Sequence, residues 1–169
     1  QPKQTVALVG RSGSGKSTLV KLLFRYFEPQ QGRILVDGED IRKLDITGYR
    51  KQLAIVHQEV DVFNGTLMDN LTYGNPHVTR EQVHEACAIP RVDEFITLMP
   101  DGYSTVVGKQ GVRLSGVQRQ RLGISRPPLM NSVVLVFDDT TSRLNYDSEP
   151  AIQMALRRIP GALPALTIA

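Results

Sequence analysis

The residues with the most specific chemistry lie in a loop near the N-terminus. Gly10-Arg11-Ser12-Gly13-Ser14-Gly15-Lys16-Ser17 fits the pattern G-x-x-x-x-G-K-[ST], with a strand-like run before it and a helix-like run after it. Glycines allow successive backbone N–H groups to point toward one centre, which forms an anion site at a helix N-terminus. We expect Lys16 to neutralise the β- and γ-phosphates of a nucleotide and the Ser17 hydroxyl to coordinate Mg²⁺. A flexible Gly/Ser turn is the alternative interpretation.

Two carboxylates follow an apolar run later in the chain. The run Val133–Phe137 is followed directly by Asp138 and Asp139. The carboxyl end of a parallel strand lies at the sheet edge where ligands bind, so we expect Asp138 beside the phosphate loop, holding Mg²⁺ through water. Asp139 is placed to orient an attacking water. An aspartate that only caps a helix or a turn is the alternative, and the phosphate loop favours the metal-binding interpretation.

The hydrophobic pattern predicts the elements that position these groups. Short apolar runs predict strands, and longer stretches with helical spacing or capping signals predict helices. The expected strands are Thr5–Val9, Arg33–Val36, Leu53–Val56, Val133–Phe137 and Ala165–Ile168. The expected helices are Lys16–Phe27, a helix opened by the capping box at Thr79 and ending at Ala88, Val92–Leu98, one that begins near Val117, and one from Asp147 or Ser148 to Ile159.

Strands alternating with helices predict an α/β fold: a P-loop NTPase core with a mainly parallel sheet and an inserted helical lobe. We interpret residues 1–169 as one domain, with a core of residues 1–60 and 132–169 and a helical lobe of about residues 61–131.

Composition excludes several other classes of protein. The net charge is only +3, from 20 basic and 17 acidic residues, and no long Lys/Arg run accompanies it, so we expect no nucleic-acid partner. Cys87 is the only cysteine, which is typical of a reducing cytosol. The longest aliphatic and aromatic run, Val133–Phe137, is far shorter than the ~20 residues that span a bilayer, so we expect a chain that is soluble in itself. The chain starts directly before a predicted strand and stops directly after one, which indicates a piece of a longer protein.

Four further segments carry a resemblance to a known family. Leu114-Ser115-Gly116-Val117-Gln118-Arg119-Gln120-Arg121 resembles the LSGGQ signature of ABC ATPases, and Val56-His57-Gln58 resembles their glutamine loop. Asp138 to Asn145 is similar to the family's D-E-A-T-S-A-L-D segment, and Phe63 to Leu71 to the segment that follows the glutamine loop in exporters. The resemblance covers nearly the whole chain in the family's order and spacing. We identify it as a resemblance to an exporter-type ABC nucleotide-binding domain.

The resemblance implies that two such domains enclose two ATP molecules head to tail, with each signature loop facing the γ-phosphate held by the other subunit. Ser115, Gly116 and Gln118 would then act on the partner's nucleotide, while Gln58 would contact the metal or water and report to a membrane domain, fused or separate, at the cytoplasmic face of the membrane. The implied cofactors are ATP and Mg²⁺. The implied ATP-binding residues of the phosphate loop are Gly10, Arg11, Ser12, Gly13, Ser14, Gly15, Lys16, Ser17 and Thr18. The implied metal-binding residues are Ser17, Gln58 and Asp138, and the implied catalytic residues are Asp139, Gln58 and Lys16.

The departures from the family pattern lie at or near the residues that the resemblance implies are functional. Asp139 stands where the family has a catalytic glutamate, and a shift of about 1 Å in that carboxylate can cost ~10²-fold in rate. Val117 replaces the second signature glycine, where a β-branched side chain crowds a backbone that approaches phosphate. Lys109 and Asn145 replace acidic residues, and Pro127-Pro128 should kink or stop the signature helix near Arg126. We therefore expect weakened nucleotide binding and little hydrolysis.

Two other functions remain open. A nucleotide-binding regulatory module that does not hydrolyse is favoured by Asp139 and Val117. A soluble ABC ATPase of DNA repair or translation is less favoured. In the repair group, very long insertions separate the phosphate loop from the signature, whereas the gap here is about a hundred residues, and the small net charge leaves little surface for phosphates.

Overall fold

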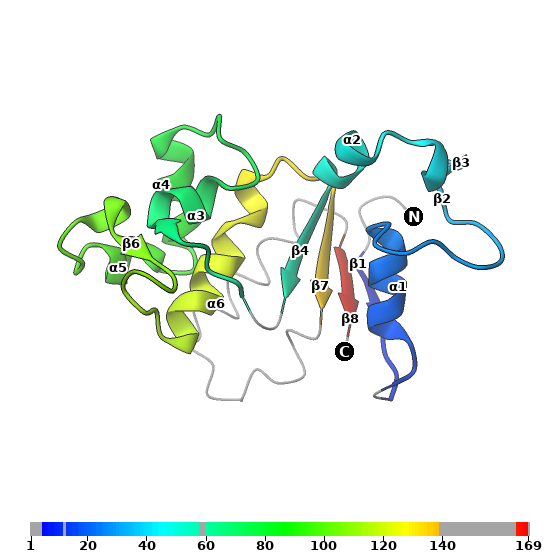
Figure 1. Cartoon of the computed structure of the whole chain (residues 1–169), viewed down its shortest axis with the longest axis horizontal. Helices are drawn as coiled ribbons and strands as arrows, with labels where there is room; N and C mark the ends of the chain where they lie inside the picture. The colour runs from blue at the N-terminus through cyan, green and yellow to red at the C-terminus, as the bar shows by residue number, and fades with distance from the viewer. Residues whose placement is uncertain (1–4, 12, 58–59, 139–164, 169) are drawn as a thin grey trace.

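A four-stranded parallel sheet forms the centre of the chain (Figure 1). The structure is a computed structural model that describes residues 5–11, 13–57, 60–138 and 165–168. The strands lie in the order β1 (Thr5–Leu8), β8 (Ala165–Ile168), β7 (Val134–Asp138) and β4 (Leu53–His57). All neighbouring strands are parallel, as the sequence predicts.

Residues on the central strands alternate between the two faces of the sheet, as the two-residue period of a strand requires. Leu53 and Val136 pack with Val20 and Phe24 on the side of α1 (Lys16–Leu23). Leu135 and Phe137, with Ala54 and Val56 of β4, pack instead with Ile124 of α6 (Gly116–Ser125). The two helices that carry the candidate phosphate-binding and signature residues therefore cover opposite faces of one sheet.

A helical lobe lies beside the sheet and contains its own cluster of buried side chains (Figure 1). Its elements are β5 (Gly65–Thr66), α3 (Leu67–Thr72), α4 (Arg80–Ala88), α5 (Val92–Ile96), η2 (Gly102–Ser104), β6 (Val106–Val107), α6 and η3 (Pro127–Leu129). The predicted capping box opens α4: the Thr79 hydroxyl accepts from the Gln82 N–H at 3.3 Å, and the Gln82 amide oxygen accepts from the Thr79 N–H at 2.8 Å. The prediction that Pro127 stops the signature helix is confirmed, because α6 ends at Ser125 and the chain continues as the 3₁₀ turn η3.

On the other side of the sheet, a hairpin and a short helix complete the fold. Strands β2 (Leu35–Val36) and β3 (Glu39–Asp40) pair antiparallel through Asp37 and Gly38, whose φ angles are 50° and 88°. The turn η1 (Ile41–Lys43) leads to α2 (Ile46–Lys51), which the sequence analysis did not predict. Asp45 caps α2 by accepting from the Gly48 N–H at 2.6 Å.

Several predicted boundaries were wrong by a few residues. The first helix ends at Leu23 rather than Phe27, because Arg25 takes a left-handed conformation with φ 53° and the Arg50 guanidinium binds the carbonyls of Phe24 and Arg25. Helix α5 ends at Ile96, two residues before the predicted end, and strand β2 spans only two residues. Strand β7 begins at Val134 and includes Asp138. The predicted helix from Asp147 or Ser148 to Ile159 lies outside the described residues. In the described part of the chain, no helix has the length and apolar composition to cross a bilayer.

Cys87 lies in α4 and is fully buried in the lobe, as expected for a small apolar residue. Burial raises the pKa of its thiol from 9.0 to about 11, although hydrogen bonds with Tyr103 and Ser125 act in the opposite direction. Because the thiolate is the nucleophile, both effects of burial, lost access and lost ionisation, protect this thiol from reagents.

We predict that Cys87 reacts with a soluble disulfide reagent at pH 8 at least about 100-fold more slowly in the folded chain than in urea, since two pKa units lower the thiolate fraction by that factor. The double variant Cys87→Ala/Ala88→Cys is the matched control, because Ala88 is the exposed neighbour on the same helix. Equal rates for the folded parent chain and the folded control would contradict the prediction.

The raised pKa of Cys87 in the folded chain also predicts that the free energy of unfolding falls as the pH rises from about 9 to about 11. Urea denaturation at a series of pH values measures this free energy.

Candidate nucleotide-binding site

The ends of all four parallel strands meet in one row. Leu8 of β1 pairs with Ile168 of β8, Ile168 pairs with Asp138 of β7, and Asp138 pairs with His57 of β4. Neighbouring strands lie about 4.8 Å apart, so the backbones of Leu8 and Asp138 are about 10 Å apart. Strand β8 thus lies between β1, which leads into the phosphate loop, and β7, which carries Asp138. Both strands still end at the same edge, where the phosphate loop begins two residues after Leu8.

Two glycines give the phosphate loop its shape. Gly13 and Gly15 have φ angles of 83° and 91°, a region that side chains disfavour. Gly10 has a different constraint, because a Cβ atom there would lie 2.9 Å from the Ser14 hydroxyl oxygen. The backbone closes with a hydrogen bond of 3.1 Å from the Ser14 N–H to the Arg11 carbonyl. The φ angles explain glycine at positions 13 and 15, whereas a Cβ atom at position 10 would displace the Ser14 hydroxyl.

Lys16 lies across the loop that it follows. Its ammonium donates to the Gly10 carbonyl at 2.5 Å and to the Arg11 carbonyl at 3.2 Å. The positive charge is therefore already held over the turn where the motif predicts phosphate oxygens, and it remains open to solvent. When an anionic ligand binds, the Lys16 ammonium would exchange its two carbonyl acceptors for the ligand, because an anion is the stronger hydrogen-bond acceptor.

The N-terminus of α1 is electrostatically suited to an anion. Gly15 occupies the N-cap, so no side chain satisfies the first N–H groups, and the first turn contains no acidic residue. The helix dipole then leaves an uncompensated positive end beside Lys16. Ser17 and Thr18 are exposed in this first turn. The donor groups of the loop, the helix end and Lys16 together fit a phosphate group, and the exposed Ser17 hydroxyl fits a hard cation beside it.

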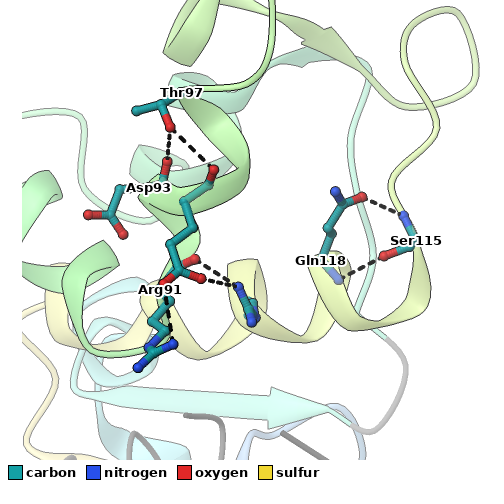
Figure 2. A network of polar contacts seen from close by, with 7 residues as sticks. Arg91, Asp93, Thr97, Ser115 and Gln118 are labelled. Carbon is teal, nitrogen blue, oxygen red and sulfur yellow. Dashed lines mark hydrogen bonds and ion pairs between the residues drawn. The ribbon is translucent and has the colours of Figure 1, made fainter.

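The predicted signature residues form the N-terminus of α6. Ser115 is the N-cap, and its hydroxyl accepts from the Gln118 N–H at 3.2 Å. The Gln118 amide oxygen in turn accepts from the Ser115 N–H at 2.8 Å, which completes a capping box (Figure 2). Ser115 and Gly116 are exposed and Gln118 is half-buried. The signature end of the helix is thus rigid and open to solvent.

Nothing within the described chain requires glycine at position 116. A Cβ atom there would meet no atom within 4 Å, and the φ angle is not in the left-handed region. The neighbouring Val117 is 47% exposed. The missing side chain leaves the backbone at this exposed point accessible to a molecule outside the chain.

Some predicted site residues lie outside the described part. Ser12, Gln58, Asp139 and Asn145 are among them, and for Asp138 only the backbone is described. The structure thus brings Gly10 to Thr18, apart from Ser12, to one edge of the sheet together with Asp138, and it leaves Ser115, Gly116 and Gln118 on the helix that covers the opposite face from α1.

A polar cluster within the helical lobe, between α3 and the C-terminal end of α6, was not predicted from the sequence. Asn70 is only 1% exposed, and its side chain bonds both Phe63 and Arg126. A signal was available, because Asn70 precedes the apolar Leu71 on the same buried side of a helix whose capping box, Thr66 with Asp69, is readable in the sequence. A buried asparagine at such a position needs partners, and this need predicts a polar contact.

Comparison with known proteins agrees with this geometry. A model of the ABC transporter family matches residues 1–142. The ATP-dependent lipid A-core flippase of Saccharophagus degradans is 43% identical over 169 residues, which is 100% of this chain and 29% of the flippase. The ABC transporter ATM1 of Toxoplasma gondii is 44% identical over 164 residues, which is 97% of this chain and 14% of that transporter.

Among solved structures, that of a bacterial Atm1-family ABC exporter with ATP bound has a TM-score of 0.87 and 39% sequence identity, and the match covers 99% of this chain and 29% of that one. The chain therefore spans less than a third of each of these relatives. The P-loop NTPase fold predicted from the sequence is confirmed. The chain belongs to the ABC transporter family, in which it is a nucleotide-binding domain of the exporter type.

Proposed function

We propose that this chain binds ATP with Mg²⁺ and takes part in transport-coupled ATP hydrolysis. The observation that carries the proposal is the shared strand-end row, which places the loop after β1 and the carboxyl end of β7 at one edge of the sheet. A triphosphate held by the loop at this edge has a metal-binding aspartate within reach.

Each predicted residue has a role in this proposal. The triphosphate is bound by residues of the phosphate loop and the first turn of α1: Gly10, Arg11, Ser12, Gly13, Ser14, Gly15, Lys16, Ser17 and Thr18. Ser17, Gln58 and Asp138 hold Mg²⁺, which neutralises charge on the phosphate oxygens when it is bound. Lys16 also stabilises that charge, Gln58 contacts the metal or water, and Asp139 orients the attacking water.

A second nucleotide-binding domain is the proposed partner across the signature. Ser115 and Gly116 are exposed at the N-terminus of α6, and glycine at position 116 has no reason within the described chain. Both facts support a head-to-tail dimer in which Ser115, Gly116 and Gln118 contact the nucleotide of the other subunit. The relatives named as a flippase and as an exporter support a further membrane partner, fused or separate, which would hold the chain at the cytoplasmic face of the membrane.

The proposal also keeps the domain division expected from the sequence. The core consists of residues 1–60 and 132–169, and the helical lobe consists of about residues 61–131.

We further propose that hydrolysis by this chain is weak. Val117 adds a β-branched side chain beside Gly116, at the exposed point where a phosphate must come close to the backbone. Asp139 has one methylene fewer than the glutamate of the family, so its carboxylate falls short of the water by about 1 Å. Neither substitution changes a residue of the phosphate loop.

The first test is the phosphate loop itself. We predict that Lys16→Ala weakens Mg-ATP binding by about 10- to 100-fold, the range expected when a hydrogen bond to a charged group worth about 1.5–3 kcal/mol is lost. Calorimetric titration measures the affinity. Lys21→Ala is the matched control, because Lys21 is exposed in the last turn of the same helix. The proposal fails if Lys16→Ala binds as tightly as the parent chain.

A second test concerns the weak hydrolysis. We predict that Asp139→Glu and Val117→Gly together raise ATP turnover by about 100-fold, since a repositioned base and a closer phosphate restore the reacting geometry. Steady-state phosphate release measures it, with Val117→Ala as a control that keeps a Cβ atom. Adding Lys16→Ala to the double variant should remove the gain. If the double variant binds ATP and still shows no turnover, the chain is a nucleotide-binding module that does not hydrolyse.

A further inference from the structure

A half-buried arginine connects the end of the signature helix to the segment that follows the glutamine loop. Arg126 is the C-cap of α6. Its Nε donates to the Asn70 carbonyl at 2.9 Å, and its Nη2 donates to the Asp61 carbonyl at 2.9 Å and to the Asn70 Oδ1 at 3.2 Å. The guanidinium carbon also lies 5.6 Å from the centroid of the Phe63 ring. One side chain thus binds residues that are 56 and 65 positions away in the sequence.

Asn70 extends this contact to the turn before α3. Its Oδ1 accepts from the Phe63 N–H at 2.9 Å as well as from Arg126, and its Nδ2 donates to the carbonyls of Phe63 and Thr66, both at 3.0 Å. Both donors and both acceptor positions of the amide are therefore used. A fully satisfied buried amide holds its partners in one geometry, because any displacement leaves a polar group unpaired.

The stretch from Asp61 to Asn70, here called the 61–70 stretch, is also fixed to the segment that enters the signature helix. The Asn64 Oδ1 accepts from the Lys109 N–H at 2.7 Å. Strand β5 of this stretch pairs with β6, and the Leu67 N–H donates to the Thr105 carbonyl at 3.0 Å. The chain then runs from β6 to Ser115 through Val112, whose N–H binds the Val106 carbonyl at 2.9 Å.

The 61–70 stretch therefore contacts both flanks of the signature helix, β6 before its start and Arg126 at its end. The stretch begins three residues after Gln58, the residue proposed to contact the metal or water. The contacts of this stretch therefore connect the chain after Gln58 to α6, in addition to the packing of Ile124 against Val56 of β4.

We propose that Arg126 is a positioning residue that, through Asp61 and Asn70, holds the 61–70 stretch and the signature helix as one rigid unit, so that the position of Ser115 follows that of the glutamine loop. This inference rests on the proposed function, because the position of Ser115 matters only if Ser115 contacts a nucleotide. The arginine suits the role because its planar fork donates in several directions at once, whereas lysine offers donors at a single point. Burial lowers the pKa of Arg126, and the high intrinsic pKa of arginine keeps it charged.

The test measures the position of the signature helix directly, without nucleotide. Cysteines at the exposed positions Lys51→Cys in α2 and Val117→Cys in α6 are spin-labelled, and pulsed electron resonance gives the distance distribution between them. Cys87 does not interfere, because it is buried and its thiol stays protonated. Arg126→Ala, Arg126→Lys and the control Arg80→Ala, which removes an exposed arginine from the first turn of α4, are made in this background.

We expect Arg126→Ala to broaden the distribution by a factor of about two, and Arg126→Lys to rescue part of the narrow width, since it keeps the charge but not the fork. Arg80→Ala should match the parent. An unchanged width in folded Arg126→Ala, at temperatures below its unfolding transition, would overturn the proposal, because it would leave Arg126 with a stabilising role only. If Arg126→Ala does not fold, Arg126→Lys provides the test. A distance distribution broader than that of the parent would support the proposal, and a distribution of the same width as the parent would contradict it.

A second measurement separates positioning from nucleotide binding. The affinity of Arg126→Ala for Mg-ATP should stay within about twofold of the parent, because the phosphate loop leads into α1, which covers the opposite face of the sheet from α6. A loss of tenfold or more would overturn the proposal in favour of a direct role at the nucleotide. If the parent chain itself does not bind ATP, the proposed function fails, while the distance result still stands as a property of the lobe.

Discussion

The parallel register of the central sheet is the constraint on which the site depends. Because every strand runs in the same direction and the pairs Leu8–Ile168, Ile168–Asp138 and Asp138–His57 fall in one line, three loops from distant parts of the sequence start at one edge. A slip of one residue would turn each inward side chain of that strand to the other face. The buried residues on both sides of β4 and β7 make such a slip costly, so core formation also fixes the site.

Local signals account for most of what the sequence predicted. The phosphate loop, the Thr79 capping box and the stop before Pro127 depend on neighbours within a few residues, and the structure has all three. The end of α1 depends instead on Arg50, which binds carbonyls 25 and 26 positions away. The place of β8 between β1 and β7 likewise depends on long connections that no short window of sequence contains. The candidate site was predictable at its motifs, and its spatial order was not.

The polar contacts between Asn70, Arg126 and the 61–70 stretch follow the same rule. Each partner looks ordinary in the sequence, and the interaction exists only because α3 and the end of α6 meet in the lobe. Motif residues thus mark where chemistry takes place, whereas the residues that hold two motifs in a fixed relation carry no motif. Such residues are found by asking which buried polar groups have used all their hydrogen bonds.

Of the two departures proposed to weaken hydrolysis, Val117 lies in the described part of the chain, at the exposed surface of α6. Nucleotide binding depends on backbone that the chain fixes for itself, through the φ angles of Gly13 and Gly15 and the strand that precedes them. Val117 instead lies 47% exposed beside Gly116, where a Cβ atom meets nothing in the described chain. The exposed part of the Val117 side chain is therefore available to contact a molecule that approaches Gly116. Under the proposed function, nucleotide binding can persist while hydrolysis weakens, because the phosphate loop and Val117 lie on different surfaces.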